Sequence, residues 1–206
     1  YVTHSSIDEN KIRNYKRELD IKTALSTVSF ECDGVNYKRT TFASIPDKVI
    51  IIKLEADKRS SFTISHGAPF FSTYSQSQGG IAAKIQGVDH EGIKAQLAAE
   101  LLFKVIDTDG SATYTDKEAQ VSNYTSAVIA IVAATNYVNY NDVKGNPSST
   151  NTVNLSKVEK IDYDPLLNNH LEAYQKQYGR VHLNLPSDAN NSKLTMTNNG
   201  THNFDI

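Results

Sequence analysis

The closely spaced turns in the first two-thirds of the chain constrain the fold more than any other feature of the sequence. Residues 24–32, ALSTVSFEC, alternate in polarity, and Asp33-Gly34 follows as a favoured two-residue hairpin turn. Residues 35–44, VNYKRTTFAS, read as the returning strand. Residues 48–56, KVIIIKLEA, are apolar on both faces, which is typical of a strand covered on both sides. The region therefore predicts a hairpin followed by a buried strand.

Further strands are predicted up to residue 135. They are residues 61–65, 81–87, 93–107, 111–115 and 126–135, with a long Ser/Gln/Gly-rich loop at 66–80. Residues 93–104 also contain strong helix formers, but turn signals at Glu91-Gly92 and Asp109-Gly110 bracket them and favour a strand. At least eight short strands, with turns about every 8–12 residues, predict a mainly β fold built as an antiparallel β-sandwich.

Beyond Pro147 the pattern becomes helical. Asp164-Pro165 fits the first turn of a helix, and Gly179 is expected to end it. An apolar stripe at i, i+4, i+7 and i+11 comprises Leu167, Leu171, Tyr174 and Tyr178. We therefore predict three regions: a β-sandwich domain over 1–147, an α-helical linker over 148–181 and an irregular tail over 182–206.

The residue counts argue against several classes of partner and site. The 21 basic and 23 acidic residues give a formal net charge of −2, and no Lys/Arg cluster predicts a nucleic-acid partner. The longest apolar stretch, residues 127–134, is less than half of a membrane span, so no membrane partner is expected. Cys32 is the single cysteine and reads as a small buried hydrophobe. We predict no cofactor and no metal site.

No catalytic residue is predicted. Carboxylates lie at turns and strand ends, where polar residues are needed, at Asp33, Asp47, Asp57, Asp89 and Asp109. The stretch Asp107-Thr108-Asp109-Gly110 resembles the start of a calcium loop but lacks the later ligands, so a hairpin turn is expected there. His66 begins the long loop and is interpreted as an exposed loop histidine.

The best candidate site is the segment ATNYVNYNDVKGNP at residues 134–147. Aromatic rings beside amide side chains are suited to sugar binding. The position of the segment, between the last predicted strand and the helical region, favours a contact with another domain. The candidate residues for substrate or interdomain contact are Asn136, Tyr137, Asn139, Tyr140 and Asp142.

Three segments occur together in a specific order. The first, at 14–57, has Arg-Glu-Leu-Asp before a hairpin, then Phe-Ala-Ser, a Pro-Asp turn and a Val/Ile-rich strand. The second is the segment at 134–147, and the third is HLEAYQKQYGRVHLNL at 170–185. As a set they resemble the N-terminal part of glycoside hydrolase family 95, the inverting α-L-fucosidases and relatives that act on α-L-galactosides.

The resemblance implies an architecture and a partner. Such enzymes have an N-terminal β-sandwich (a supersandwich-like fold), a helical linker, a catalytic (α/α)6 barrel and a C-terminal β-domain. This chain resembles the sandwich, shortened at its front, and the linker. The implied partners are the barrel and fucosylated or galactosylated glycans, with a periplasmic or secreted location in a bacterium. His170, Tyr174, Tyr178 and Arg180 are implied to pack within the linker.

Two other functions remain open. A stand-alone carbohydrate-binding module would stack Tyr137 and Tyr140 on sugar rings, and a structural interaction domain would have no ligand. The chain has no Trp, the ring most useful for stacking on sugars. The amphipathic stripe needs a partner surface, which a helix leading into a barrel would have. The sequence therefore favours the non-catalytic domain of a larger glycoside hydrolase.

Overall fold

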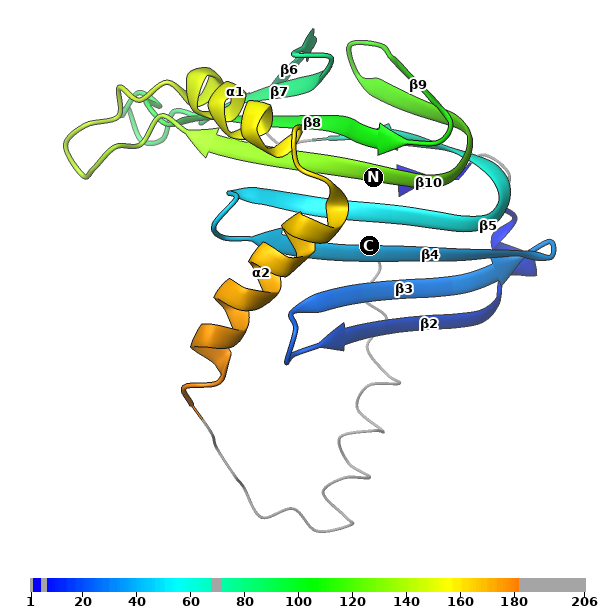
Figure 1. Cartoon of the computed structure of the whole chain (residues 1–206). Coiled ribbons are helices and arrows are strands. Elements are labelled where there is room, and N and C mark those ends of the chain that lie inside the picture. The colour runs from blue at the N-terminus through cyan, green and yellow to red at the C-terminus, as the bar shows by residue number, and fades with distance from the viewer. Residues whose placement is uncertain (1, 5–6, 68–71, 182–206) are drawn as a thin grey trace.

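The computed structural model describes residues 2–4, 7–67 and 72–181. Within them the chain is mainly β, as predicted, and two α-helices follow the strands (Figure 1). The strands are β1 (Val2–Thr3), β2 (Arg13–Asp20), β3 (Leu25–Cys32), β4 (Val35–Ser44), β5 (Val49–Ser65), β6 (Ser72–Ser77), β7 (Gly80–Gln86), β8 (Ala98–Thr108), β9 (Ser111–Tyr114) and β10 (Glu118–Thr135). The helices are the 3₁₀ turn η1 (Glu9–Lys11), α1 (Pro147–Val158) and α2 (Tyr163–Tyr178).

The strands pair antiparallel in one continuous sheet. Its order is β2-β3-β4-β5-β10-β8-β7-β6, with β1 paired to β5 and β9 paired to β10. Between β3 and β4, Asp33 and Gly34 have φ values of 50° and 71°. Positive φ at both central residues is what a tight two-residue hairpin requires, so the predicted turn is confirmed.

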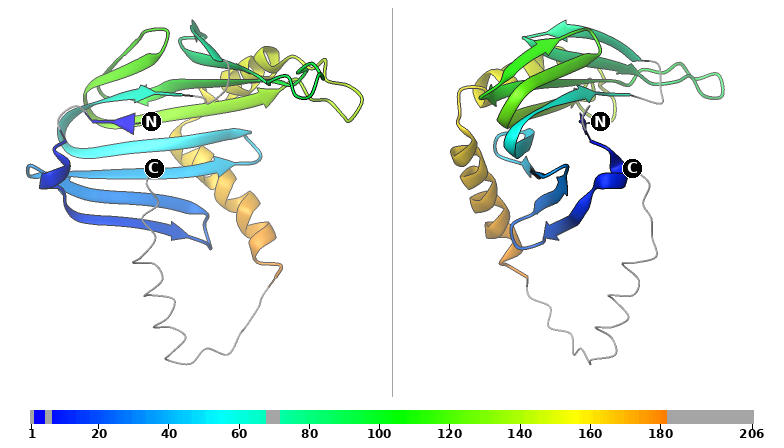
Figure 2. Two further views of the ribbon diagram at one scale, coloured as in Figure 1. Left: turned by 180° about the vertical axis from the view of Figure 1, so that it is seen from behind. Right: turned by 90° about the vertical axis from the view of Figure 1, so that its right-hand side faces the viewer.

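β5 and β10 are long because each contributes to two parts of the sheet. Residues 49–56 of β5 pair with β4, whereas residues 60–65 pair with the first half of β10. The register between β5 and β10 shifts between Val121 and Ser126, and Asn123 has a φ of 57° there. Such bulges bend a strand and increase its twist. The sheet therefore curls over itself, with the helices along its outer side (Figure 2).

Side chains are buried on both faces of the sheet, which explains the apolar run predicted at 48–56. Within β10, Ile129 packs into the inner cluster and its neighbour Val128 packs into the outer one. The inner cluster is enclosed by the curled sheet and includes Leu54, Phe62, Ile81, Phe103 and Tyr124. The outer cluster includes Phe42, Ile51, Leu102, Leu155 and Leu166, and is covered by the helices. This arrangement is consistent with a β-sandwich carrying a helical layer.

The first helix is fixed by its cap and by polar contacts with β8. The side chain of Asn146 accepts the amide of Ser149 at 3.1 Å, and Pro147 occupies the first turn. Asn151 is fully buried and donates to the backbone carbonyl of Glu100 at 2.8 Å. These contacts hold α1 against the strands that form the outer cluster.

Several predicted boundaries differ from the structure. The predicted strand at 61–65 is the end of the continuous β5, and residues 72–77 form the strand β6 inside the predicted loop. The strand predicted at 93–107 begins only at Ala98, because residues 87–97 form a loop. Gly179 follows α2 as predicted, with φ −69° rather than a left-handed conformation. The predicted tail at 182–206 lies outside the described residues, and the division into three regions stays a prediction.

Candidate functional site

The candidate loop after β10 is tied to the neighbouring loop by Asn136. Its amide nitrogen donates to the carbonyls of Gln96 at 2.7 Å and Val143 at 2.8 Å. Its amide oxygen accepts the backbone N–H of Ala98 at 2.9 Å. Asn136 therefore connects the loop at 136–146 with the loop at 87–97, and its polar atoms are occupied within the protein.

Asn139 and Asp142 form the base of a tight turn. Their backbones exchange two hydrogen bonds of 3.1 Å, N–H to carbonyl in each direction. The Asn139 side chain accepts the amide of Asn141 at 3.1 Å, and the Asp142 carboxylate accepts the amide of Lys144 at 2.9 Å. These are Asx-type contacts, which fix the turn locally. Both side chains are thus partly engaged in shaping the loop.

The two tyrosines of this turn project into solvent. Tyr140 is 90% exposed and Tyr137 is 54% exposed, and the intervening Val138 is 56% exposed. Of the five candidate residues, three therefore build the loop and two are displayed by it. A large exposed apolar group needs a reason, because it loses free energy in water that it would regain on contact.

The adjacent loop at 87–97 displays a second set of apolar side chains. Val88, Ile93 and Leu97 are each at least half exposed. Asp89 organises the loop: it accepts the amide of Ala95 at 2.9 Å and the ammonium of Lys94 at 2.6 Å. These two hydrogen bonds hold the pKa of Asp89 below its usual value, the amide contributing most.

The predicted linker residues lie on α2, and His170 is the most buried of them. Its imidazole is 3% exposed and stacks on Phe42, with ring centroids 4.9 Å apart. Nδ1 lies 3.1 Å from the carbonyl oxygen of Ala43, and Nε2 lies 2.8 Å from that of Thr23. One side chain thus joins α2 to the end of β4 and to the turn between β2 and β3.

The remaining linker residues continue this contact toward the end of the helix. The hydroxyl of Tyr174 donates to the carbonyl of Ile21 at 2.7 Å, and its ring stacks on Tyr178 with centroids 5.8 Å apart. Leu167 packs against the outer cluster. Much of the apolar stripe therefore meets the sheet of this same chain. Arg180 is exposed, and its backbone amide bonds to the carbonyl of Gln177.

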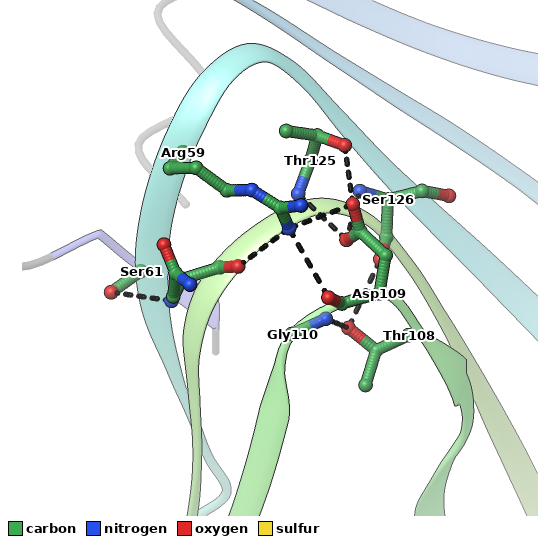
Figure 3. Close-up of polar contacts among 8 residues, drawn as sticks. Arg59, Ser61, Thr108, Asp109, Gly110, Thr125 and Ser126 are labelled. Carbon is green, nitrogen blue, oxygen red and sulfur yellow. Dashed lines mark hydrogen bonds and ion pairs between the residues drawn. The ribbon is translucent and has the colours of Figure 1, made fainter.

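A polar corner at the bend of β5 and β10 was not recognised in the sequence as a structural centre (Figure 3). Asp109 accepts the amides of Thr125 and Ser126 at 2.8 and 3.0 Å, and the hydroxyl of Thr125 at 2.6 Å. Arg59 forms a 2.8 Å ion pair with the same carboxylate and donates to the carbonyl of Asn123 at 2.8 Å. The amide of Ser126, followed by the contacts of Thr125, lowers the pKa of Asp109 strongly.

The hairpin predicted at residues 107–110 does not form. β8 and β9 both pair antiparallel with β10, Thr108 opposite Ala127 and Ser111 opposite Ser122, so the chain bends at Asp109-Gly110 without reversing. The chain reverses instead between β9 and β10, where the amide of Thr115 donates to the carbonyl of Glu118 at 2.8 Å. A Cβ on Gly110 would clash with the carbonyl of Ser122, so the close approach of these strands requires glycine. The carboxylate is already occupied by four protein donors. The corner therefore stabilises the bend. Sequence reasoning missed it because its members are up to 67 positions apart, from Arg59 to Ser126.

Two half-buried histidines lie among aromatic rings. His66 packs edge-on against Tyr74 and Phe103, with centroids 4.4 and 5.2 Å away, so it differs from the expected exposed loop residue. Burial lowers its pKa. His4 lies among the inner-cluster rings of Tyr37 and Phe62, and burial, with a smaller effect of Arg39, lowers its pKa to about 4.

Two shallow pockets lie away from the candidate loop. They measure about 420 and 470 Å³ and border Tyr37 near the hairpin of β3 and β4. Across residues 2–4, 7–67 and 72–181, no group of His, Cys, Asp and Glu side chains is arranged to hold a metal ion. In the same part of the chain, no helix has the length and apolarity to span a membrane.

These features define a class of protein: an accessory β-sandwich-like domain whose turns occupy its own polar groups and whose outer face carries a helical layer. Comparison with known proteins agrees. The sequence model of the family described as "Glycosyl hydrolase family 65, N-terminal domain" matches residues 1–140. The chain therefore belongs to this family of glycosyl hydrolase N-terminal domains.

Two relatives extend the comparison. Alpha-L-fucosidase 2 of Arabidopsis thaliana is 29% identical over 209 residues, covering 88% of this chain and 25% of the relative. A solved structure described as a kojibiose phosphorylase from the human microbiome matches with a TM-score of 0.60 at 12% identity, covering 86% of this chain and 27% of its own. The second likeness shows the fold alone. The chain spans about a quarter of the length of the curated relative it matches.

Proposed function

We propose that this chain is the non-catalytic N-terminal region of a family 95 α-L-fucosidase-like glycoside hydrolase. In this proposal it packs on a catalytic barrel and supports that barrel in the hydrolysis of α-L-fucosyl or α-L-galactosyl glycans. The observation that carries the proposal is the match to the α-L-fucosidase, which continues past the β domain and covers 88% of the chain.

The side chains of the described residues support a role without chemistry. Inverting glycoside hydrolysis needs an acid and a base about 6.5–9.5 Å apart across a pocket that admits a sugar. Here the carboxylates of Asp20, Asp89 and Asp142 accept hydrogen bonds inside their own turns, and that of Asp109 accepts them from β10. Such carboxylates shape loops, and a separate domain would have to supply the acid and the base.

A stand-alone carbohydrate-binding module is the second candidate, because Tyr137 and Tyr140 are exposed on one turn. Sugar-binding sites combine such rings with polar groups that face the ligand. The amide of Asn136 is instead fully engaged with the protein backbone, and Asn139 and Asp142 each accept a backbone amide. The polar half of a sugar site is therefore weakly developed, which favours the first candidate.

The proposal is tested on the full-length polypeptide that contains this chain. We expect it to hydrolyse nitrophenyl α-L-fucoside or α-L-galactoside with inversion at the anomeric carbon, followed by NMR of the first-formed sugar. Absence of both activities, or retention of configuration, would reject the family 95 assignment. The module candidate is tested separately by titrating the 206-residue chain with fucosylated oligosaccharides: a tyrosine fluorescence change that is lost in Tyr137→Ala and Tyr140→Ala would favour it.

A further inference from the structure

Exposed apolar side chains gather at one end of the sheet. The turns between β2 and β3 and between β4 and β5, the loop between β7 and β8, and the loop after β10 all lie at this end, because of the antiparallel order. Eight of the fourteen large apolar residues that are exposed in the described chain belong to these four segments. They are Ile21, Ile45, Val88, Ile93, Leu97, Tyr137, Val138 and Tyr140. We call this set the apolar end.

The opposite end of the same strands has a different character. Its turns are Asp33-Gly34 between β3 and β4, Gln78-Gly79 between β6 and β7, and residues 115–117 between β9 and β10. None of the exposed large apolar residues of the described chain lies in these turns. Turns reverse the chain at both ends, so turn formation alone does not explain why one end carries exposed apolar residues. A contact made by that end would explain them.

Three aspartates at the apolar end are already bonded within their own segments or to α2. Asp20 accepts the amide of Lys22 at 2.9 Å and the hydroxyl of Thr23 at 2.8 Å. Asp89 is held by Lys94 and Ala95, as described above. Asp47 accepts the side-chain amide of Asn169, on α2, at 3.1 Å. Covering these carboxylates costs less than covering free ones, because part of their hydration is already replaced by protein donors.

The apolar end is also held in shape before any contact. Asn136 joins its two largest loops by two side-chain hydrogen bonds, to Gln96 and Ala98, and makes a third to Val143 within its own loop. The amide of Gly87 also bonds to the carbonyl of Leu97 at 3.0 Å. The exchange of backbone bonds between Asn139 and Asp142 fixes the turn that displays Tyr140. A preorganised surface loses little conformational entropy on binding, as an interface requires.

The helical segment runs along this same end. Asn169 contacts Asp47, His170 contacts Thr23, and Tyr174 contacts Ile21, so successive turns of α2 cross the turns of the apolar end. The last turns of α2 therefore lie beside the turn between β2 and β3, which belongs to this surface. The matched α-L-fucosidase is about four times as long as the part that this chain covers. The protein region best placed to contact the apolar end is therefore the one that follows α2.

We propose that the apolar end is the surface on which the catalytic domain of the same polypeptide docks, through a complementary apolar and aromatic patch. This inference rests on the proposed function for the identity of the occupant. Its central contacts are Ile93, Leu97, Tyr137, Val138 and Tyr140, on the two loops joined by Asn136. Tyr137 and Tyr140 then serve as interdomain anchors, in keeping with the enrichment of tyrosine at protein interfaces.

Cysteine labelling tests this docking directly. Tyr140→Cys and Ile93→Cys place reporters on the apolar end, and Ser111→Cys is the matched control, exposed at the start of β9 near the opposite end. The native Cys32 is 2% exposed and serves as an internal blank. The rate of reaction with a maleimide is measured for each variant in the 206-residue chain and in the full-length polypeptide.

We expect both apolar-end reporters to react about tenfold more slowly in the full-length polypeptide, a protection worth about 1.4 kcal/mol, with Ser111→Cys unchanged. Equal rates in the two contexts would overturn the proposal. Protection in the 206-residue chain that grows with its concentration would identify a second copy as the occupant, and protection by millimolar L-fucose would identify a sugar; either overturns it. Labelling does not depend on hydrolysis, so a protected but inactive polypeptide would reject the proposed function while retaining the interface.

Discussion

At the scale of single residues, the fold depends on a few polar side chains that close long sequence separations. Asp109 gathers amides and a hydroxyl from β10 together with the guanidinium of Arg59 on β5. A carboxylate that accepts several N–H groups is stabilised in its charged form. The bend that lets the sheet cover its own inner cluster is therefore secured by one acidic residue between β8 and β9.

The substitution Asp109→Asn tests this role through its pH dependence. The pKa of Asp109 is lowered in the folded protein, so its stabilising effect is fully present above the unfolded-state pKa of about 4 and is lost as pH falls below it. We expect the variant to have a lower free energy of unfolding at pH 7, and the gap to wild type to narrow at pH 3. Urea unfolding at both values measures it. The control is Asp107→Asn, an exposed residue nearby on β8; an equal effect there would contradict the assignment.

His170 shows how one side chain joins the helix to the sheet. His170→Phe keeps an aromatic ring on Phe42 but leaves the carbonyls of Ala43 and Thr23 without their partner. We expect a loss of about 1–3 kcal/mol in the free energy of unfolding, measured by urea denaturation. Asn168→Ala changes an exposed residue of the same helix and is expected to stay within about 0.5 kcal/mol of wild type. A similar, small change in both variants would show that His170 does not fasten α2.

At the scale of elements, the two loops of the apolar end act as one unit because Asn136 joins them. Asn136→Asp keeps an acceptor for the amide of Ala98 but turns a carboxylate oxygen toward the carbonyls of Gln96 and Val143. We expect amide hydrogen exchange in 93–98 and 143–145 to accelerate about tenfold or more. Tyr140→Ala, which removes a 90% exposed ring, should leave exchange there unchanged. Unaltered exchange in Asn136→Asp would mean that the loops are held by other contacts.

The sequence predicts the elements best where the pattern reflects local physics. Alternation and the Asp33-Gly34 turn located β3 and β4, and the Pro and Gly residues bracketed α2, because these signals act within a few residues. The edge strand β6 was missed because STYSQS has no apolar alternation; its pairing with β7 stabilises it. The length of β5 was missed because the exposed Asp57, Lys58 and Arg59 at its bend resemble a turn.

The segment at 134–147 stays a predicted site, and the structure adds which of its residues face solvent. Tyrosine and asparagine content marked the segment at 134–147 from sequence alone. Which residues face solvent depended on partners about 40 positions away, such as Gln96 and Ala98 for Asn136. The apolar residues of 87–97 were read as part of a strand, so their contribution to the same surface became visible only in the fold.

At the scale of the whole molecule, the curled sheet and the two helices bury both faces of the central strands. Of the large apolar residues that are exposed in the described chain, most lie at one end, whose turn between β2 and β3 contacts α2. The carboxylates of Asp20, Asp89, Asp109 and Asp142 are occupied in turns and at the bend. These features fit the supporting role that we propose for this glycosyl hydrolase N-terminal domain.

If this chain contributes no catalysis of its own, the isolated chain will not hydrolyse a fucoside. The purified 206-residue chain and the full-length polypeptide are assayed side by side, at equal molar concentration, with nitrophenyl α-L-fucoside. We expect the full-length polypeptide to release nitrophenol. We expect the 206-residue chain to react at a rate indistinguishable from the buffer blank. Fucoside hydrolysis that co-purifies with the 206-residue chain and saturates with substrate would contradict a non-catalytic role.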